Sequence, residues 1–225
     1  NIALAVSRPE TSIFWMNIIH QIARELSCHN VNLVYTYLPS FISWNYVLPA
    51  SLTNGNTHGI IIMNVYNEEL LRLLAACPIP KVFFDTATAV PAAELNGDLL
   101  LTENYTSISK ITEHLIKKGR KSFGFIGDIN YAKSNFERFD GFSRTLLQHG
   151  LPVNPELNLT SSIGIDTYKE EIESFLDRLP SMPDAFVCAS DYVGCILMQL
   201  LTKRGIRIPE DVALSGFDAN LENPL

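Results

Sequence analysis

The sequence has little of what a metal centre, a redox-active thiol pair or a membrane anchor requires. Its four cysteines show no CxxC spacing, and its five histidines form no HExxH or HxxxH pattern. Neither a zinc site nor a catalytic dithiol is therefore indicated. No apolar run reaches the roughly 18 residues of a membrane-spanning helix, and no signal peptide is visible. We expect a reduced, cytoplasmic chain without a cofactor, a metal or a membrane partner.

Positive charge is also scarce. The chain carries 17 Lys and Arg residues against 24 Asp and Glu residues, which gives a formal net charge of −7. Because contacts to phosphates need clustered cations, this chain by itself is expected to bind nucleic acid poorly. The densest basic cluster, at residues 117–121, is expected at a helix end, where cations stabilise the helix dipole.

The motifs of common catalysts are missing as well. There is no GxGxxG or P-loop sequence and no GxSxG elbow, and no pair of carboxylates stands out as an acid and a base. We therefore expect no enzymatic activity, and a small α/β enzyme is the least favoured interpretation.

What the sequence does contain is a regular alternation of short apolar runs with helix-period segments. The runs are continuous, as is typical of parallel strands that are covered on both faces. They span residues 2–6, 31–35, 59–63, 81–84, 122–126, 184–189 and 212–215. Apolar stripes predict helices over residues 15–26, 108–116, 139–147, 168–179 and 193–201, with Thr11 or Ser12 capping the first. This pattern predicts doubly wound α/β structure.

The irregular segment 86–102, which contains Pro91 and Gly97, separates two such blocks. We therefore predict two lobes, residues 1–101 and 102–225. Asn1 already stands inside a strand-like run, so the chain is expected to be part of a longer protein.

Polar side chains follow most of the predicted strands. They are Ser7-Arg8, Asn64, Asp85, Gly127-Asp128, Ser190-Asp191 and Asp218. Because ligands of open α/β sheets bind beyond the carboxyl ends of the strands, these groups predict a cleft for a hydroxylated, neutral ligand.

The last 40 residues carry the most specific signal. The string Ile208-Pro-Glu-Asp-Val-Ala-Leu-Ser-Gly-Phe-Asp218 resembles the hallmark of the LacI/GalR family of bacterial transcription regulators, and Arg138-Phe-Asp-Gly-Phe142 resembles the family's effector-binding motif. The resemblance implies a core like a type I periplasmic binding protein, with two Rossmann-like lobes around a cleft. It also implies a homodimer and a separate DNA-binding headpiece that this chain lacks. A final strand–helix portion of the family is lacking too, so the lobe of residues 1–101 is expected to be incomplete.

The same resemblance implies site residues. Arg138 and Asp218 are expected to hold the effector, since an Arg fork donates to adjacent oxygens and a carboxylate accepts from hydroxyls. Replacing either is expected to weaken effector binding by about tenfold or more, with little loss of stability. Ser190 stands where the family has Asn and is also a candidate contact, whereas Asp191 is expected mainly to cap the next helix.

Further candidates precede residue 105. Phe14 and Trp15 occupy the place of the family's aromatic pair; they could stack on a sugar ring or hold the first helix in the core. Asp85 ends a strand and is a candidate effector contact. Asn104 is either a helix N-cap or a group beside the hinge.

Together these features predict the ligand-sensing core of a LacI-type regulator, acting as a repressor. The effector is expected to be a sugar bound between the lobes, although the sequence identifies neither the sugar nor whether it induces or co-represses. The alternative is a periplasmic-type sugar-binding receptor of a transporter, which shares the fold.

Overall fold

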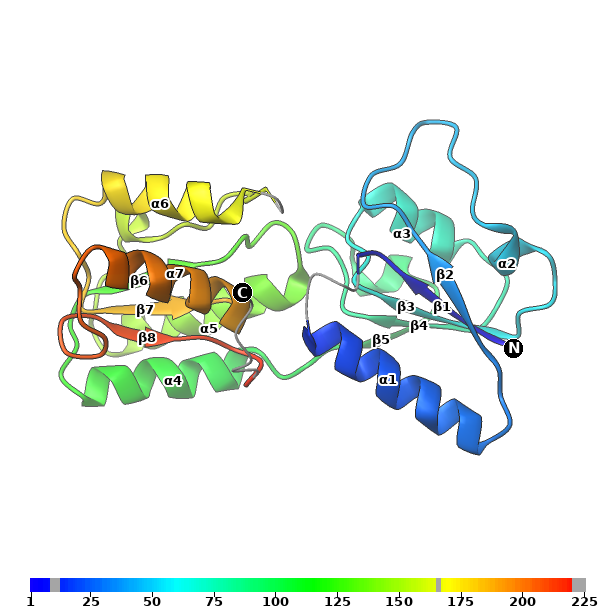
Figure 1. Cartoon of the computed structure of the whole chain (residues 1–225), viewed down its shortest axis with the longest axis horizontal. Helices are drawn as coiled ribbons and strands as arrows, with labels where there is room; N and C mark the ends of the chain where they lie inside the picture. Colours follow the sequence, from blue (N-terminus) through cyan, green and yellow to red (C-terminus); the bar gives the residue numbers. More distant parts are fainter. Residues whose placement is uncertain (9–12, 165–166, 220–225) are drawn as a thin grey trace. The chain divides into compact units, whose positions relative to one another are not determined.

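The computed structural model describes residues 1–8, 13–164 and 167–219. It divides into two compact units (Figure 1). The first comprises Asn1–Thr102 with Ala132–Ser134, and the second comprises Glu103–Tyr131 with the chain from Asn135 onward. The expected cap at Thr11 or Ser12 lies outside the described residues.

The first unit is built on a five-stranded parallel sheet in the order β2-β1-β3-β4-β5. Its strands are β1 (Ile2–Val6), β2 (Leu33–Tyr37), β3 (Gly59–Met63), β4 (Lys81–Phe84) and β5 (Asp98–Leu100). Its helices are α1 (Ile13–Cys28), α2 (Ala50–Thr53), α3 (Glu68–Ala75) and the short 3-10 helix η2 (Ala92–Glu94).

Alternation along the strands explains why this sheet is covered on both faces. In β1, Ala3 and Ala5 pack with the leucines of α3, whereas Leu4 and Val6 pack with Ile19 of α1. Successive side chains of a strand point to opposite faces, so a continuous apolar run requires a helix layer on each side. Figure 1 shows α1 and α3 on opposite faces of this sheet.

The second unit repeats the plan with a three-stranded parallel sheet in the order β6-β7-β8. The strands are β6 (Phe123–Ile126), β7 (Ala185–Cys188) and β8 (Ala213–Ser215). The helices are α4 (Tyr105–Lys117), α5 (Lys133–Gln148), α6 (Tyr168–Arg178), α7 (Asp191–Lys203) and the 3-10 helix η3 (Pro155–Leu157).

The core of the second unit again has two layers. Phe186 and Cys188 of β7 pack with α6 and α7, and Ala185 and Val187 pack with α4 and α5. The predicted parallel α/β architecture is thereby confirmed in both units.

The short helices α2, η2 and η3 were not predicted, and two further elements also differ from the sequence prediction. Strand β5 lies inside segment 86–102, which was expected to be irregular, and its three residues alternate too briefly to give a pattern. Helix α3 was also missed, although Asn67 caps it by accepting a hydrogen bond from the Leu70 backbone N–H at 2.9 Å.

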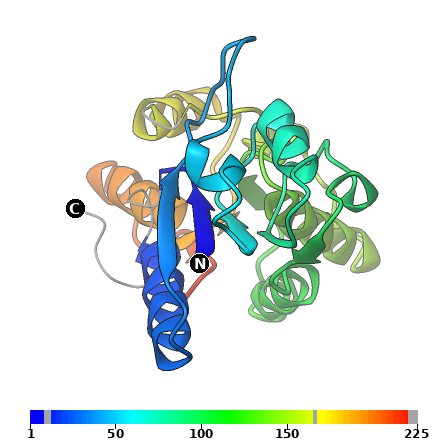
Figure 2. The ribbon, with the colours of Figure 1, turned by 90° about the vertical axis from the view of Figure 1, so that its right-hand side faces the viewer.

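The segment between β2 and α2 stands away from the sheet in both views (Figures 1 and 2) and exposes Phe41 and Trp44. Across the residues that the structure describes, no helix is long and apolar enough to cross a membrane. In the same part of the chain, no group of three or more His, Cys, Asp or Glu side chains is arranged to hold a metal ion.

Candidate functional site

Parallel pairing brings the ends of β6, β7 and β8 to one edge of the second unit's sheet. The polar residues that follow these strands are Asp128, Ser190 and Asp218. Sequence order alone placed them in three separate segments; the sheet makes them neighbours at its carboxyl edge, where open α/β sheets bind ligands.

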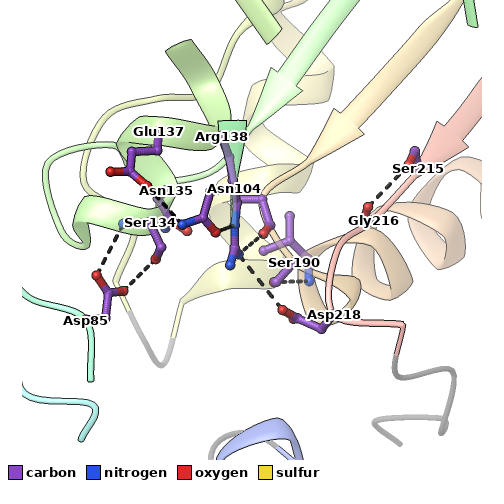
Figure 3. Close-up of polar contacts among 12 residues, drawn as sticks. Asp85, Asn104, Ser134, Asn135, Glu137, Arg138, Ser190, Ser215, Gly216 and Asp218 are labelled. Carbon is purple, nitrogen blue, oxygen red and sulfur yellow. Dashed lines mark hydrogen bonds and ion pairs between the residues drawn. The ribbon is translucent and has the colours of Figure 1, made fainter. Parts of the chain in front are cut away.

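Arg138 is the central side chain of this edge (Figure 3). It is 7% exposed, and it contacts groups from several separate segments of the second unit. Its Nε donates to Asn104 Oδ1 at 2.9 Å and its Nη1 donates to the Ala189 carbonyl at 2.5 Å. The guanidinium carbon also lies 3.8 Å from the centre of the Phe217 ring, a cation–π geometry. The guanidinium plane is therefore fixed on its edge and on one face.

Asp218 supplies the opposite charge. Its Oδ1 lies 4.0 Å from Arg138 Nη1, too far for a direct hydrogen bond but close enough for an ion pair. Burial raises the pKa of the Asp218 carboxyl above its ordinary value, the Arg138 charge opposes that rise, and Asp191 adds to it. The Arg138 guanidinium thus places charged hydrogen-bond donors beside the partly desolvated carboxylate acceptor of Asp218.

Gly141 explains how Arg138 reaches its partners. A Cβ at Gly141 would lie 2.5 Å from the carbonyl oxygen of Tyr105, the first residue of α4. Only glycine allows the two helices to approach this closely. Because Arg138 lies three residues earlier on α5, it falls on the same face as Gly141 and meets Asn104 at the start of α4.

Ser190, and not Asp191, occupies the capping position before α7. Ser190 is the N-cap of α7, where its Oγ accepts from the Val193 backbone N–H at 3.3 Å. Asp191 instead begins the helix, and its backbone N–H donates to the Phe217 carbonyl at 2.8 Å, which ties α7 to the segment before Asp218. The expectation that Asp191 caps the helix was wrong; an effector contact of Ser190 stays a prediction.

Asn104 stands at the N-cap position of α4, but its side chain makes no capping hydrogen bond. It accepts from Arg138 and donates from Nδ2 to Glu137 Oε2 at 3.0 Å. The preceding Glu103 caps the helix by accepting from the backbone N–H groups of Thr106 and Ser107. Of the two roles left open for Asn104, the capping role is excluded.

Asp128, which the sequence placed among the polar groups after the strands, and Tyr168, which it did not, extend the polar edge. The Asp128 carboxylate accepts from the Asn130 and Tyr131 backbone N–H groups, and burial raises its pKa. Burial, the Asp128 charge and other neighbouring acidic groups raise the pKa of Tyr168 to about 12, so this phenol stays a neutral donor. Tyr168 had been assigned only to the apolar stripe of α6, since a stripe does not indicate which aromatic residue begins a helix beside a strand end.

In the first unit, Asp85 follows β4 and is 7% exposed. Its carboxylate accepts four hydrogen bonds, from the Tyr66 hydroxyl, the Thr86 backbone N–H and both the backbone N–H and the hydroxyl of Ser134. A carboxylate with this many internal donors anchors the segment at Ser134 (Figure 3). Its role as an effector contact stays a prediction.

Phe14 and Trp15 belong to α1 and pack on Phe84 of β4. The ring centres of Trp15 and Phe84 are 5.4 Å apart in an edge-to-face geometry, and those of Phe14 and Phe84 are 6.5 Å apart. Both rings therefore attach α1 to the sheet, which is the core-packing role left open by the sequence. Stacking on an effector stays a prediction for both.

Comparison with known proteins adds to this geometry. Residues 112–223 match the family model of the periplasmic binding protein-like domain. Catabolite control protein A of Staphylococcus aureus (strain Mu50 / ATCC 700699) is 29% identical over 171 residues, which cover 75% of this chain and 49% of that protein. The chain therefore contains a periplasmic binding protein-like domain, and its relatives and structural neighbours include LacI-type regulators.

Solved structures agree with the periplasmic binding protein-like fold. The complex of the transcriptional regulator CelR with cellobiose superposes with a TM-score of 0.84 at 24% identity, covering 97% of this chain and 67% of that one. The Lac repressor dimer bound to operator and the anti-inducer ONPF gives a TM-score of 0.76 at 16% identity, covering 98% of this chain and 75% of that one. At these identities the likeness establishes the fold. The chain spans about half the length of the curated relatives it matches.

Proposed function

We propose that this chain is the ligand-sensing core of a LacI-type transcriptional repressor and that it binds a sugar at the carboxyl edge of the β6-β7-β8 sheet. The observation that carries the proposal is the placement of Arg138 beside Asp218 at that edge. A neutral polyol offers acceptors and donors on adjacent carbons, and this pair offers a complementary donor and acceptor. The cellobiose held by CelR supports a carbohydrate as the class of effector.

Sensing requires that the effector bind two conformations of the regulator with different affinity. The resulting shift would change how a DNA-binding headpiece meets its operator, so the coupling acts through conformation and not through charge on this acidic core. The dimeric, operator-bound state of the Lac repressor supports a homodimer that acts on DNA in the cytoplasm.

The second candidate is a sugar-binding receptor of a transporter, because that class shares the fold. The likeness to catabolite control protein A, a regulator, favours the sensor over the receptor. The relatives carry the names of regulators, so no catalytic step is proposed.

A gel-shift titration with the complete gene product and its own promoter region tests this function. We expect operator binding whose affinity changes roughly 5- to 150-fold when the effector sugar is added from a panel of glucose, galactose, lactose and cellobiose. The chain described here should give no shift by itself at moderate salt, because its net charge is −7.

Two results would contradict the proposal. One is a complete gene product that binds no DNA although it binds a sugar, which would favour the transport receptor. The other is sequence-specific DNA binding by this chain alone.

A further inference from the structure

The amide of Asn104 stands between two groups of opposite hydrogen-bonding character. Arg138 has only donors, and an ionised Glu137 carboxylate has only acceptors. Asn104 meets both, accepting from Arg138 Nε at 2.9 Å and donating to Glu137 Oε2 at 3.0 Å. The orientation of its amide is therefore dictated by chemistry on both sides.

We propose that Glu137 is a positioning residue for the effector-binding arginine and that it acts through the Asn104 amide. By holding Nδ2, Glu137 keeps Oδ1 turned toward Arg138. The consequence for the effector rests on the proposed function, but the orientation itself does not require an effector.

Burial makes this orientation important. Asn104 is 1% exposed and Arg138 is 7% exposed. If the amide turned over, its NH₂ group would face the guanidinium, and two donors would oppose one another in a site with little water. A buried donor without an acceptor is costly, so the charge-assisted bond to Glu137 selects one of the two amide orientations.

The remaining contacts of Arg138 show what the orientation controls. Nη1 is held by the Ala189 carbonyl, and the Phe217 ring covers one face of the guanidinium. Asn104 holds the third point, at Nε. These three contacts together fix the plane of the guanidinium group. If Nε lost its acceptor, the guanidinium could tilt relative to Asp218. The donor and acceptor that are proposed to bind the effector would then no longer be aligned.

A double-mutant cycle read without any ligand tests the proposal. The readout is the solvent-exchange rate of the Arg138 Nε–H in ¹H–¹⁵N spectra, with the signal assigned by its loss in Arg138→Lys. In the wild-type background we expect Glu137→Gln to speed this exchange about tenfold, because a Gln carboxamide can either donate or accept and no longer selects one amide orientation.

In the Asn104→Asp background, the effect of Glu137→Gln on the Nε–H exchange rate should have the opposite sign. There the carboxylate at position 104 faces Glu137, so two like charges oppose one another, and Glu137→Gln replaces that repulsion by a donor. The same substitution should now slow the Nε–H exchange. If Glu137 only stabilised the helix in general, Glu137→Gln would change the Nε–H exchange rate in the same direction in both backgrounds.

Glu113→Gln is the matched control, because Glu113 is a partly exposed α4 residue whose carboxylate pairs with Lys117 at 3.3 Å. It should leave the Arg138 signal unchanged. Unaltered exchange in Glu137→Gln, or a change of the same sign in both backgrounds, would overturn the proposal. Glu137 is partly exposed, so Glu137→Gln is expected to fold, and its own result decides the matter even if Asn104→Asp does not fold. Because no effector is present, failure here leaves the sugar-sensing function untouched.

Discussion

For the single residue Arg138, a sequence motif predicted the position in the site but not the effect of its removal on stability. The sequence predicted that it binds the effector, and the structure places it in a polar cluster with Asp218. The sequence led us to expect that removing Arg138 would cost little stability. Because Arg138 is buried, we now expect a larger loss. Arg138→Ala would leave the Asn104 and Ala189 oxygens without this donor, at a cost of roughly 1–3 kcal/mol for each unsatisfied group. Arg138→Lys, which keeps the charge, is the better probe of binding.

Asp218 gives a pH-dependent prediction. Its raised pKa means that the folded state favours the protonated carboxyl, so its contribution to stability is present below the unfolded-state pKa and is lost as the pH rises through the folded-state pKa. Asparagine cannot ionise. The stability of Asp218→Asn relative to the wild type should therefore increase between about pH 4 and pH 7.

Urea unfolding at several pH values measures this difference. A constant difference would show that the attraction of Arg138 balances the desolvation of Asp218, and a difference that falls with rising pH would show that it outweighs the desolvation.

The candidate site was predictable where one residue type serves one purpose. Arg138 and Asp218 could be named because the segments that contain them, Arg138-Phe-Asp-Gly-Phe142 and Ile208–Asp218, resemble motifs of a known family. Asn104 could not be assigned, because an Asn before a helix is an ordinary cap and its diversion depends on Arg138, 34 positions later. The cap of α7 was assigned to Asp191 and not to Ser190, because both residue types cap helices and only backbone geometry decides between adjacent positions.

At the scale of elements, the contact between α4 and α5 is the feature most open to test. Gly141→Ala would place a methyl group 2.5 Å from the Tyr105 carbonyl oxygen. We expect a loss of about 1–3 kcal/mol of stability, because neither backbone can move without shifting a helix. Gly194 of α7 is the matched control, since the nearest atom to an added Cβ there is 3.8 Å away. Gly194→Ala should stabilise the protein by about 0.5–1 kcal/mol through helix propensity.

Chemical unfolding of the two alanine variants provides the measurement. Equal effects of the same sign would mean that the close approach at Gly141 does not constrain the helices.

The strands and helices that bury a continuous apolar surface were the ones that could be predicted from the sequence. The seven predicted strands each correspond to an observed strand, because a continuous apolar run of four to six residues has few other uses in a folded α/β chain. Strand β5 has an exposed Asp98 and a half-exposed Leu100, so no run marks it. Its pairing with β4 creates the strand, and that pairing is a tertiary effect that local sequence does not express.

At the scale of the whole molecule, the acidic composition and the fold lead to one account. An acidic two-unit α/β core is suited to sensing a neutral ligand and not to holding DNA directly. Both features fit the proposal that DNA is bound by a separate headpiece, as the likeness to LacI-type regulators implies.

Titration calorimetry with this chain and the sugars of the panel tests the central claim most directly. We expect one sugar to bind the wild-type chain, Asp218→Asn and Arg138→Lys each to weaken its affinity at least about tenfold, and Asp140→Asn on the exposed side of α5 to leave the affinity unchanged. A sugar that binds the wild type and both site variants with equal affinity would contradict the account, because the effector would then be held elsewhere.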